Sequence, residues 1–143
     1  MIRLSVVIPS FHDPLLIPTV RSLLDNSELG DGLEVICVLD GMWRSDIPDD
    51  KRVHILHLGA NRGMREAINA GVRVARGEFI MRTDEHCIFD KGFDLKLIAR
   101  FEDNWIVYPK RFYLDPVKWV NGENPIMDKA PNIYNRLIID NSR

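Results

Sequence analysis

The segment Leu4-Ser5-Val6-Val7-Ile8-Pro9 carries a clear signal for the fold class, because it is a short, β-branched apolar run that a proline ends. Such a run predicts a strand buried on both faces, as in a parallel sheet. Residues 33–39 repeat the pattern and end at Asp40-Gly41, residues 53–58 alternate apolar residues with two histidines, and residues 79–81 form a short apolar run. Four strands are therefore expected between positions 4 and 81.

Helical spacing fills the segments between these strands. Pro14 and Pro18 both suit the first turn of a helix, which should fade near Asn26. Residues 64–75 carry a second apolar stripe, and Gly77 stands where the glycine after a helix C-terminus belongs. The chain thus predicts helices that connect parallel strands.

The pattern weakens toward the C-terminus. Asp90 can cap a third helix with apolar residues between 93 and 101, and residues 105–108 are expected to form a fifth strand. From Pro109 onward, prolines and asparagines break the periodicity, so we expect loops and short pieces there. Residues 137–140 resemble an unfinished strand, which suits a truncated chain.

Composition excludes several classes of protein. The chain has 143 residues, of which 45% are apolar, enough for one domain with a hydrophobic core. Its net charge of −2 gives no general attraction to nucleic acid or to an anionic membrane surface. No stretch approaches the roughly 18 apolar residues of a membrane span. Cys37 and Cys87 are isolated, so we expect free thiols in a soluble cytoplasmic protein.

The order of strands and helices predicts an α/β fold with a mainly parallel sheet and helices on both faces. Ligands of such folds bind beyond the carboxyl ends of the strands. Three polar clusters stand at these ends, namely residues 9–13, Asp40-Gly41 and residues 84–86. If the strands are parallel neighbours, the three clusters meet at one edge of the sheet.

Asp84 and His86 are candidate metal ligands. The chain has no GxxxxGK[ST] phosphate loop, and no GxGxxG follows its first strand, which argues against a Rossmann oxidoreductase. In an extended segment, residues i and i+2 point the same way. One carboxylate oxygen and one imidazole nitrogen would suit Mn²⁺, whereas a purely oxygen set would suit Mg²⁺. The simpler alternative is that Asp84 caps a turn and His86 is a solvated loop residue.

Asp40 and Phe11 offer contacts for a nucleobase. The Asp40 carboxylate could accept an N–H from a base such as uracil, or it could belong to an ordinary Asp-Gly turn. The Phe11 ring could stack on a base, which is worth about 1–3 kcal/mol, or it could simply pack.

Two arginines lie near the same strand ends. Arg65 stands at the head of the second helix, where free N–H groups can hold a phosphate, although it could also be only solvated. Arg82 ends the fourth strand, and a charge in a buried strand usually has a partner. Asp84, Glu85 and a bound phosphate are the candidates for that partner.

The combined pattern resembles the family 2 glycosyltransferases with the GT-A fold over about residues 3–108. The resemblance rests on several segments together: Ser5-Val6-Val7-Ile8-Pro9-Ser10-Phe11, Ser22-Leu23-Leu24, residues 34–41, Asn61-Arg62-Gly63, Asn69-Ala70-Gly71, residues 75–80 and Thr83-Asp84-Glu85-His86. The last segment falls where that family has its DxD metal motif.

The resemblance implies a GT-A, Rossmann-like fold with a nucleotide-sugar-binding core over residues 1–108 and a short or truncated acceptor-side segment over 109–143. It implies transfer of a sugar from a nucleotide-diphosphate sugar, expected to be a UDP-sugar, to an unknown saccharide, protein or lipid, assisted by Mn²⁺ or Mg²⁺. The implied donor-binding residues are Pro9, Ser10, Phe11, Asp40 (to the base), Arg65 (to the diphosphate) and Asp84 (to ribose and metal), with His86 as the second metal ligand.

Two departures from the family pattern bear on function. His86 replaces the usual final aspartate, which resembles the DxH motif of the polypeptide N-acetylgalactosaminyltransferases and favours a UDP-activated N-acetylhexosamine. The second departure is the short C-terminal part. GT-A enzymes usually have a second half that binds the acceptor and supplies the general base, whereas Asp115, Glu123 and Asp128 after Tyr108 stand in no recognisable motif, so the general base is unassigned.

Two alternatives stay open. One is a non-catalytic nucleotide-sugar-binding module. The other is a nucleotidyltransferase, although the first strand lacks the glycine- and lysine-rich loop that would hold a triphosphate.

Overall fold

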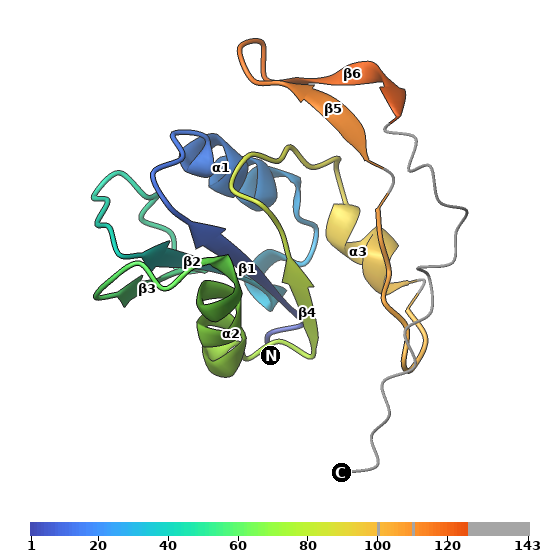
Figure 1. Cartoon of the computed structure of the whole chain (residues 1–143). Helices are drawn as coiled ribbons and strands as arrows, with labels where there is room; N and C mark the ends of the chain where they lie inside the picture. Colours follow the sequence, from blue (N-terminus) through green and yellow to red (C-terminus); the bar gives the residue numbers. More distant parts are fainter. Residues whose placement is uncertain (100, 110, 126–143) are drawn as a thin grey trace.

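The computed structural model describes residues 1–99, 101–109 and 111–125 (Figure 1). A four-stranded sheet has the order β3-β2-β1-β4, and a separate two-stranded sheet pairs β5 with β6. The elements in chain order are β1 (Leu4–Ser10), α1 (Leu16–Asn26), the 3-10 helix η1 (Gly30–Gly32), β2 (Leu33–Asp40), β3 (Val53–Leu58), α2 (Met64–Val74), β4 (Phe79–Arg82), α3 (Phe93–Ile98), β5 (Phe112–Asp115) and β6 (Val120–Pro125).

All neighbouring strands of the larger sheet are parallel, as the sequence predicts. β1 lies between β2 and β4, with Ser10 opposite Leu39 and Val7 opposite Arg82. The carboxyl ends of β1, β2 and β4 therefore lie at the same edge of the sheet. The polar residues that follow these strands meet there.

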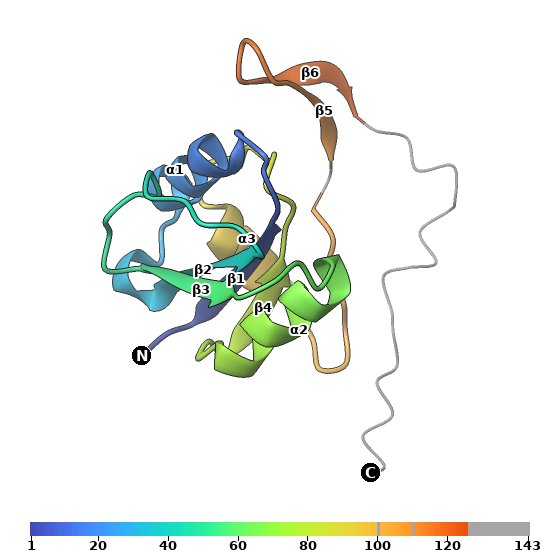
Figure 2. The ribbon, with the colours of Figure 1, turned by 60° about the vertical axis from the view of Figure 1, so that its left-hand side comes forward.

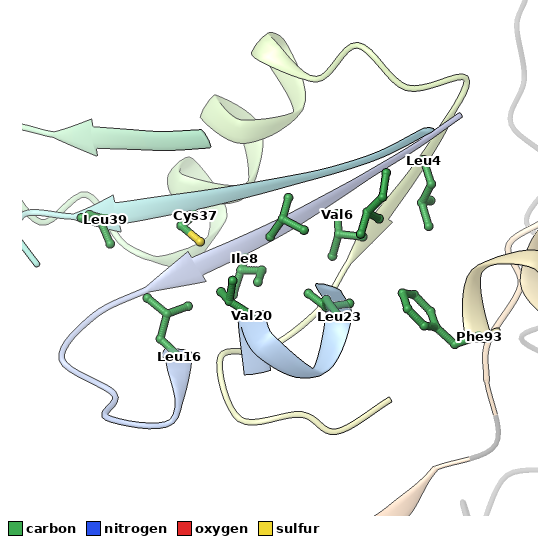
Figure 3. Packing of buried hydrophobic residues seen from close by; sticks show 11 residues of the cluster. Leu4, Val6, Ile8, Leu16, Val20, Leu23, Cys37, Leu39 and Phe93 are labelled. Atoms are coloured by element: carbon green, nitrogen blue, oxygen red, sulfur yellow. The ribbon is translucent and has the colours of Figure 1, made fainter. Parts of the chain in front are cut away.

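Helices cover both faces of the sheet, and the core follows from the two-residue period of the strands. α1 and α3 lie on one face and α2 on the other (Figures 1 and 2). Leu4, Val6 and Ile8 of β1 pack toward α1 and α3 (Figure 3), whereas Val7 belongs to the second cluster, which includes Ala67 of α2. Every residue of β1 and β2 is buried, which confirms the interpretation of both runs as strands covered on two faces.

β4 differs from the expected buried strand. It forms the edge of the sheet, and its residues alternate between half-buried and exposed. The ends of two helices also differ from expectation. α2 ends at Val74, so Gly77 lies beyond the cap, at a place where an added Cβ would come within 2.5 Å of the Ser5 backbone nitrogen. The N-cap of α3 is Gly92 and not the expected Asp90. Asp90 contributes only its carbonyl oxygen, which accepts the Phe93 N–H at 3.1 Å.

The expected strand over residues 105–108 is wrong. These residues follow a turn in which the Trp105 N–H donates to the Glu102 carbonyl, and they have no strand partner among the described residues. The expectation of short pieces after Pro109 is met by the antiparallel β5–β6 hairpin. Residues 137–140 and Asp128 lie outside the described residues. None of the described helices has the length and apolar content needed to cross a membrane.

Candidate functional site

A pocket of about 320 Å³ lies at the carboxyl ends of β1, β2 and β4. Every predicted site residue except Arg65 lines it. The residues that line the pocket are Pro9, Ser10, Phe11, Asp40, Asn61, Gly63, Met64, Ala67, Asp84, Glu85 and His86. Arg65 is exposed and is not among them, so its role toward a diphosphate stays a prediction.

A larger hollow of about 410 Å³ lies on the outer side of α1, where Arg21, Asp25 and Trp119 contribute to its walls. It contains none of the polar residues at the strand ends. Because ligands of parallel α/β sheets bind at the carboxyl ends of the strands, the smaller pocket is the candidate site.

The loop after β1 is held in an unusual conformation. His12 has a φ of 64°, and its N–H donates to the Met42 sulfur at 2.8 Å. Arg44 donates to the Asp13 carbonyl at 2.5 Å. Phe11 is about half exposed at the pocket, and its N–H donates to the Glu85 carboxylate at 3.2 Å. The aromatic ring is therefore available to a flat ligand.

Asp40 is almost fully buried and accepts two backbone hydrogen bonds. Its two oxygens accept the N–H groups of Arg62 and Gly63 at 2.6 and 2.8 Å. Gly41 has a φ of 80°, and a Cβ there would lie 2.2 Å from the Asn61 nitrogen, so only glycine fits the turn. The interpretations as a turn residue and as a pocket residue are compatible, since Asp40 holds the loop before α2 and also lines the pocket.

The segment that carries Asp84 and His86 is not extended, contrary to expectation. The chain bends at Glu85 and His86, so the i and i+2 geometry does not apply, although both side chains line the same pocket. Arg82 is about two-fifths exposed, and its partner is Asp84, with 2.6 Å between guanidinium nitrogen and carboxylate oxygen.

Thr19 of α1 fixes this segment, and the sequence interpretation missed it. Its buried hydroxyl donates to the Glu85 carbonyl at 3.0 Å and accepts the Cys87 N–H at 2.9 Å. His86 is held by its ring, because its Nδ1 lies 2.9 Å from an Asp13 carboxylate oxygen. The only sequence signal for Thr19 was its position, because this polar residue stands at the helical spacing of the apolar residues Leu16, Val20 and Leu23.

Two buried oxygen atoms of the pocket residues lack a partner within the described part of the chain. They are the Ser10 hydroxyl and the second carboxylate oxygen of Glu85. Buried polar atoms normally have hydrogen-bond partners, so such atoms mark where a bound molecule or an ordered water is needed. No group of three His, Cys, Asp or Glu side chains in the described ranges is placed to hold a metal ion by itself.

Comparison with known proteins identifies the family. The model for "Glycosyl transferase family 2" matches residues 5–141. The chain belongs to glycosyl transferase family 2. A search of curated proteins found no match for this family 2 chain.

Solved structures of TarS from S. aureus share the fold of this family 2 chain. TarS 1–349 superimposes with a TM-score of 0.54 at 19% identity, over 68% of this chain and 31% of that protein. A longer TarS chain gives a TM-score of 0.55 at 19% identity, over 68% of this chain and 19% of that chain. TarS 1–349 in complex with UDP gives a TM-score of 0.53 at 20% identity, over 68% of this chain and 31% of that chain. The chain thus spans less than a third of each, and its fold is the mixed α/β, mainly parallel GT-A type.

Proposed function

We propose that the pocket binds a nucleotide-diphosphate sugar, specifically a UDP-sugar, and that the protein transfers the sugar to an acceptor. The observation that carries the proposal is the convergence of polar and aromatic residues from three strand ends in one cavity of about 320 Å³. Membership of family 2 supports it, as does the similar fold of TarS, which was crystallised with UDP. The acceptor is left open as a saccharide, protein or lipid.

The pocket residues can recognise a nucleoside. Phe11 can stack on the base, with a contribution of about 1–3 kcal/mol. A carboxylate offers about four lone-pair positions, and the loop N–H groups use two of those on Asp40, so the others can accept an N–H from the base. The unpartnered oxygens of Ser10 and Glu85 can pair with ligand hydroxyls.

Asp84 and His86 are the residues that would hold a divalent cation. An oxygen and a nitrogen donor in one pocket fit Mn²⁺ better than Mg²⁺, and ligand oxygens would complete the coordination. When bound, the cation would neutralise charge on the departing diphosphate. Arg82 lies against Asp84 and holds one of its oxygens, so the second oxygen is the one available to a cation.

The resemblance of Asp84-Glu85-His86 to the DxH motif of the polypeptide N-acetylgalactosaminyltransferases supports an N-acetylhexosamine as the transferred sugar, so UDP-N-acetylhexosamines are the first donors to test. A cytoplasmic location, in keeping with the two free cysteines, belongs to the same proposal.

Calorimetry with UDP and UDP-sugars, with and without Mn²⁺, tests donor binding. We expect Mn²⁺ to strengthen binding, and His86→Ala to remove this increase. His57→Ala, an exposed histidine outside the pocket, is the matched control and should leave it unchanged. Absence of metal-enhanced binding in the wild type would contradict the proposal. Release of UDP in the presence of candidate acceptors then tests transfer, and binding without hydrolysis or transfer would reduce the function to donor binding.

A further inference from the structure

We propose that Asp13 is a positioning residue for His86, which it holds as the tautomer with the proton on Nδ1, so that Nε2 is the atom offered to a metal ion. The inference rests on the proposed function for its metal, and on the structure for the Asp13–His86 pair. Asp13 Oδ2 lies 2.9 Å from His86 Nδ1. An ionised carboxylate can only accept hydrogen bonds, so Nδ1 must carry the hydrogen.

The Asp13 carboxylate is fixed independently of His86. Its other oxygen accepts the Leu15 N–H at 2.7 Å, and Arg44 donates to the Asp13 carbonyl at 2.5 Å. Only about a fifth of the Asp13 side chain is exposed, against 55% for His86. The well-held residue therefore orients the exposed one.

The backbone around His86 is fixed from a third element. Thr19 of α1 bonds the Glu85 carbonyl and the Cys87 N–H, which flank His86 on both sides. No described residue reaches His86 Nε2 with a hydrogen bond, and His86 lines the pocket. A neutral imidazole with Nδ1–H has its lone pair on Nε2, and a carboxylate behind a ligating histidine raises its basicity and fixes its ring.

Nitrogen-15 NMR of the imidazole rings tests the pair without metal or activity. At about pH 8.5, where neutral imidazoles dominate, His86 should show a protonated Nδ1 and an unprotonated Nε2. The His86→Ala variant assigns its signals among the four histidines. Asp13→Asn should give a mixture of tautomers, because an amide can both donate and accept. A predominant Nε2–H tautomer in the wild type, or an unchanged tautomer in Asp13→Asn, would overturn the proposal.

Electron paramagnetic resonance of Mn²⁺, titrated in the presence of UDP, tests the consequence for metal binding. Asp13→Asn should weaken Mn²⁺ binding by roughly 10- to 100-fold. Asp13→Glu should restore part of the loss, and Asp31→Asn, an exposed carboxylate paired with Lys51, should cause none. Equal Mn²⁺ affinity in Asp13→Asn and wild type would overturn the positioning role. Failure of the wild type to bind Mn²⁺ would instead contradict the proposed function, while the NMR result still decides the Asp13–His86 pair.

Discussion

Glu34 is a single buried carboxylate that joins three parts of the chain. It is 1% exposed at the start of β2, and it accepts the Ser5 hydroxyl of β1 at 2.5 Å. Arg76, after α2, donates from its backbone N–H at 3.0 Å and from its guanidinium at 2.6 Å. A buried group with several partners is costly to remove, because each partner is then left unpaired.

We therefore expect Glu34→Gln to lower the free energy of unfolding by about 1–3 kcal/mol in urea denaturation. Glu66→Gln is the matched control, because Glu66 pairs with Arg73 at the surface, with 44% and 66% of the two side chains exposed. Exposed pairs contribute about 0–1 kcal/mol. Equal effects of the two substitutions would contradict the role given to Glu34.

Stability should also depend on pH through this residue. Burial raises the pKa of Glu34, but hydrogen bonds from Ser5 and Arg76 outweigh burial, so the pKa lies below the ordinary 4.5. Because the pKa of Glu34 is lower in the folded state than in the unfolded state, the ionised carboxylate stabilises the folded protein. This stabilisation is complete above pH 4.5 and is lost as the pH falls through the folded-state pKa. The stability difference between wild type and Glu34→Gln should shrink on acidification below pH 4.5. A constant difference would argue against the lowered pKa.

At the scale of elements, α2 lies directly on the sheet because of Gly71. A Cβ at Gly71 would lie 2.5 Å from a methyl carbon of Val7 and 2.9 Å from one of Val38. Valine side chains are stiff at χ1, so neither methyl can easily turn away. Because glycine has no side chain, Gly71 allows α2 to pack this closely against β1 and β2.

Gly71→Ala should lower the free energy of unfolding by about 1–3 kcal/mol through overpacking. Alanine favours helix by about 1 kcal/mol over glycine, so an increase in stability would mean that α2 can move away from the sheet. Asn69→Ala, at an exposed position of the same helix, should be neutral or slightly stabilising in the same thermal or urea measurement.

Thr19 links α1 to the segment that carries Asp84 and His86. Thr19→Val keeps the shape but removes the hydroxyl, which leaves the Glu85 carbonyl and the Cys87 N–H without their partner. We expect a loss of about 1–3 kcal/mol in the free energy of unfolding and weaker Mn²⁺-dependent UDP binding by calorimetry. Thr19→Ser retains the hydroxyl and should keep most of the binding. A valine variant that binds like wild type would show that α1 does not hold the segment.

For the whole molecule, the rate at which the Cys37 thiol is labelled measures how often the sheet opens. It lies in β2 against the α1 face and is fully buried (Figure 3). Burial raises its pKa to about 12, so the thiolate that reacts with disulfide reagents is scarce in the folded state. Cys87, in the pocket segment, is half-buried.

Thiol labelling with an aromatic disulfide should therefore occur in two phases. Cys87 should react first. Cys37 should react at least on the order of 10³-fold more slowly, because it is accessible only in unfolded molecules, which make up a fraction of roughly 10⁻³ to 10⁻⁶ of a native protein. The Cys87→Ser variant should keep only the slow phase, and urea should accelerate it. Rapid labelling of Cys37 without denaturant would mean that β2 opens locally.

The α/β architecture could be predicted from the sequence, because apolar runs, helical stripes and prolines act through local structure that the fold retains. The runs at 4–8 and 33–39 became the two fully buried strands. The positions of the polar clusters after these strands also followed from the sequence, because parallel strands bring their carboxyl ends to one edge. Every predicted site residue except Arg65 lines the candidate pocket, whereas Asn61, Met64 and Ala67 line it without having been predicted.

The contacts between side chains far apart in the sequence became visible in the folded chain alone. Asp13 and His86 are 73 positions apart, and Thr19 meets the Cys87 N–H across 68 positions. The bend at Glu85 and His86, which replaces the expected extended segment, is held by these contacts. Hydrogen bonds between distant loops depend on where the fold places their backbones, which the local periodicity of the sequence does not specify. For this reason six of the pocket residues could be predicted from the sequence, but their hydrogen-bond partners could not.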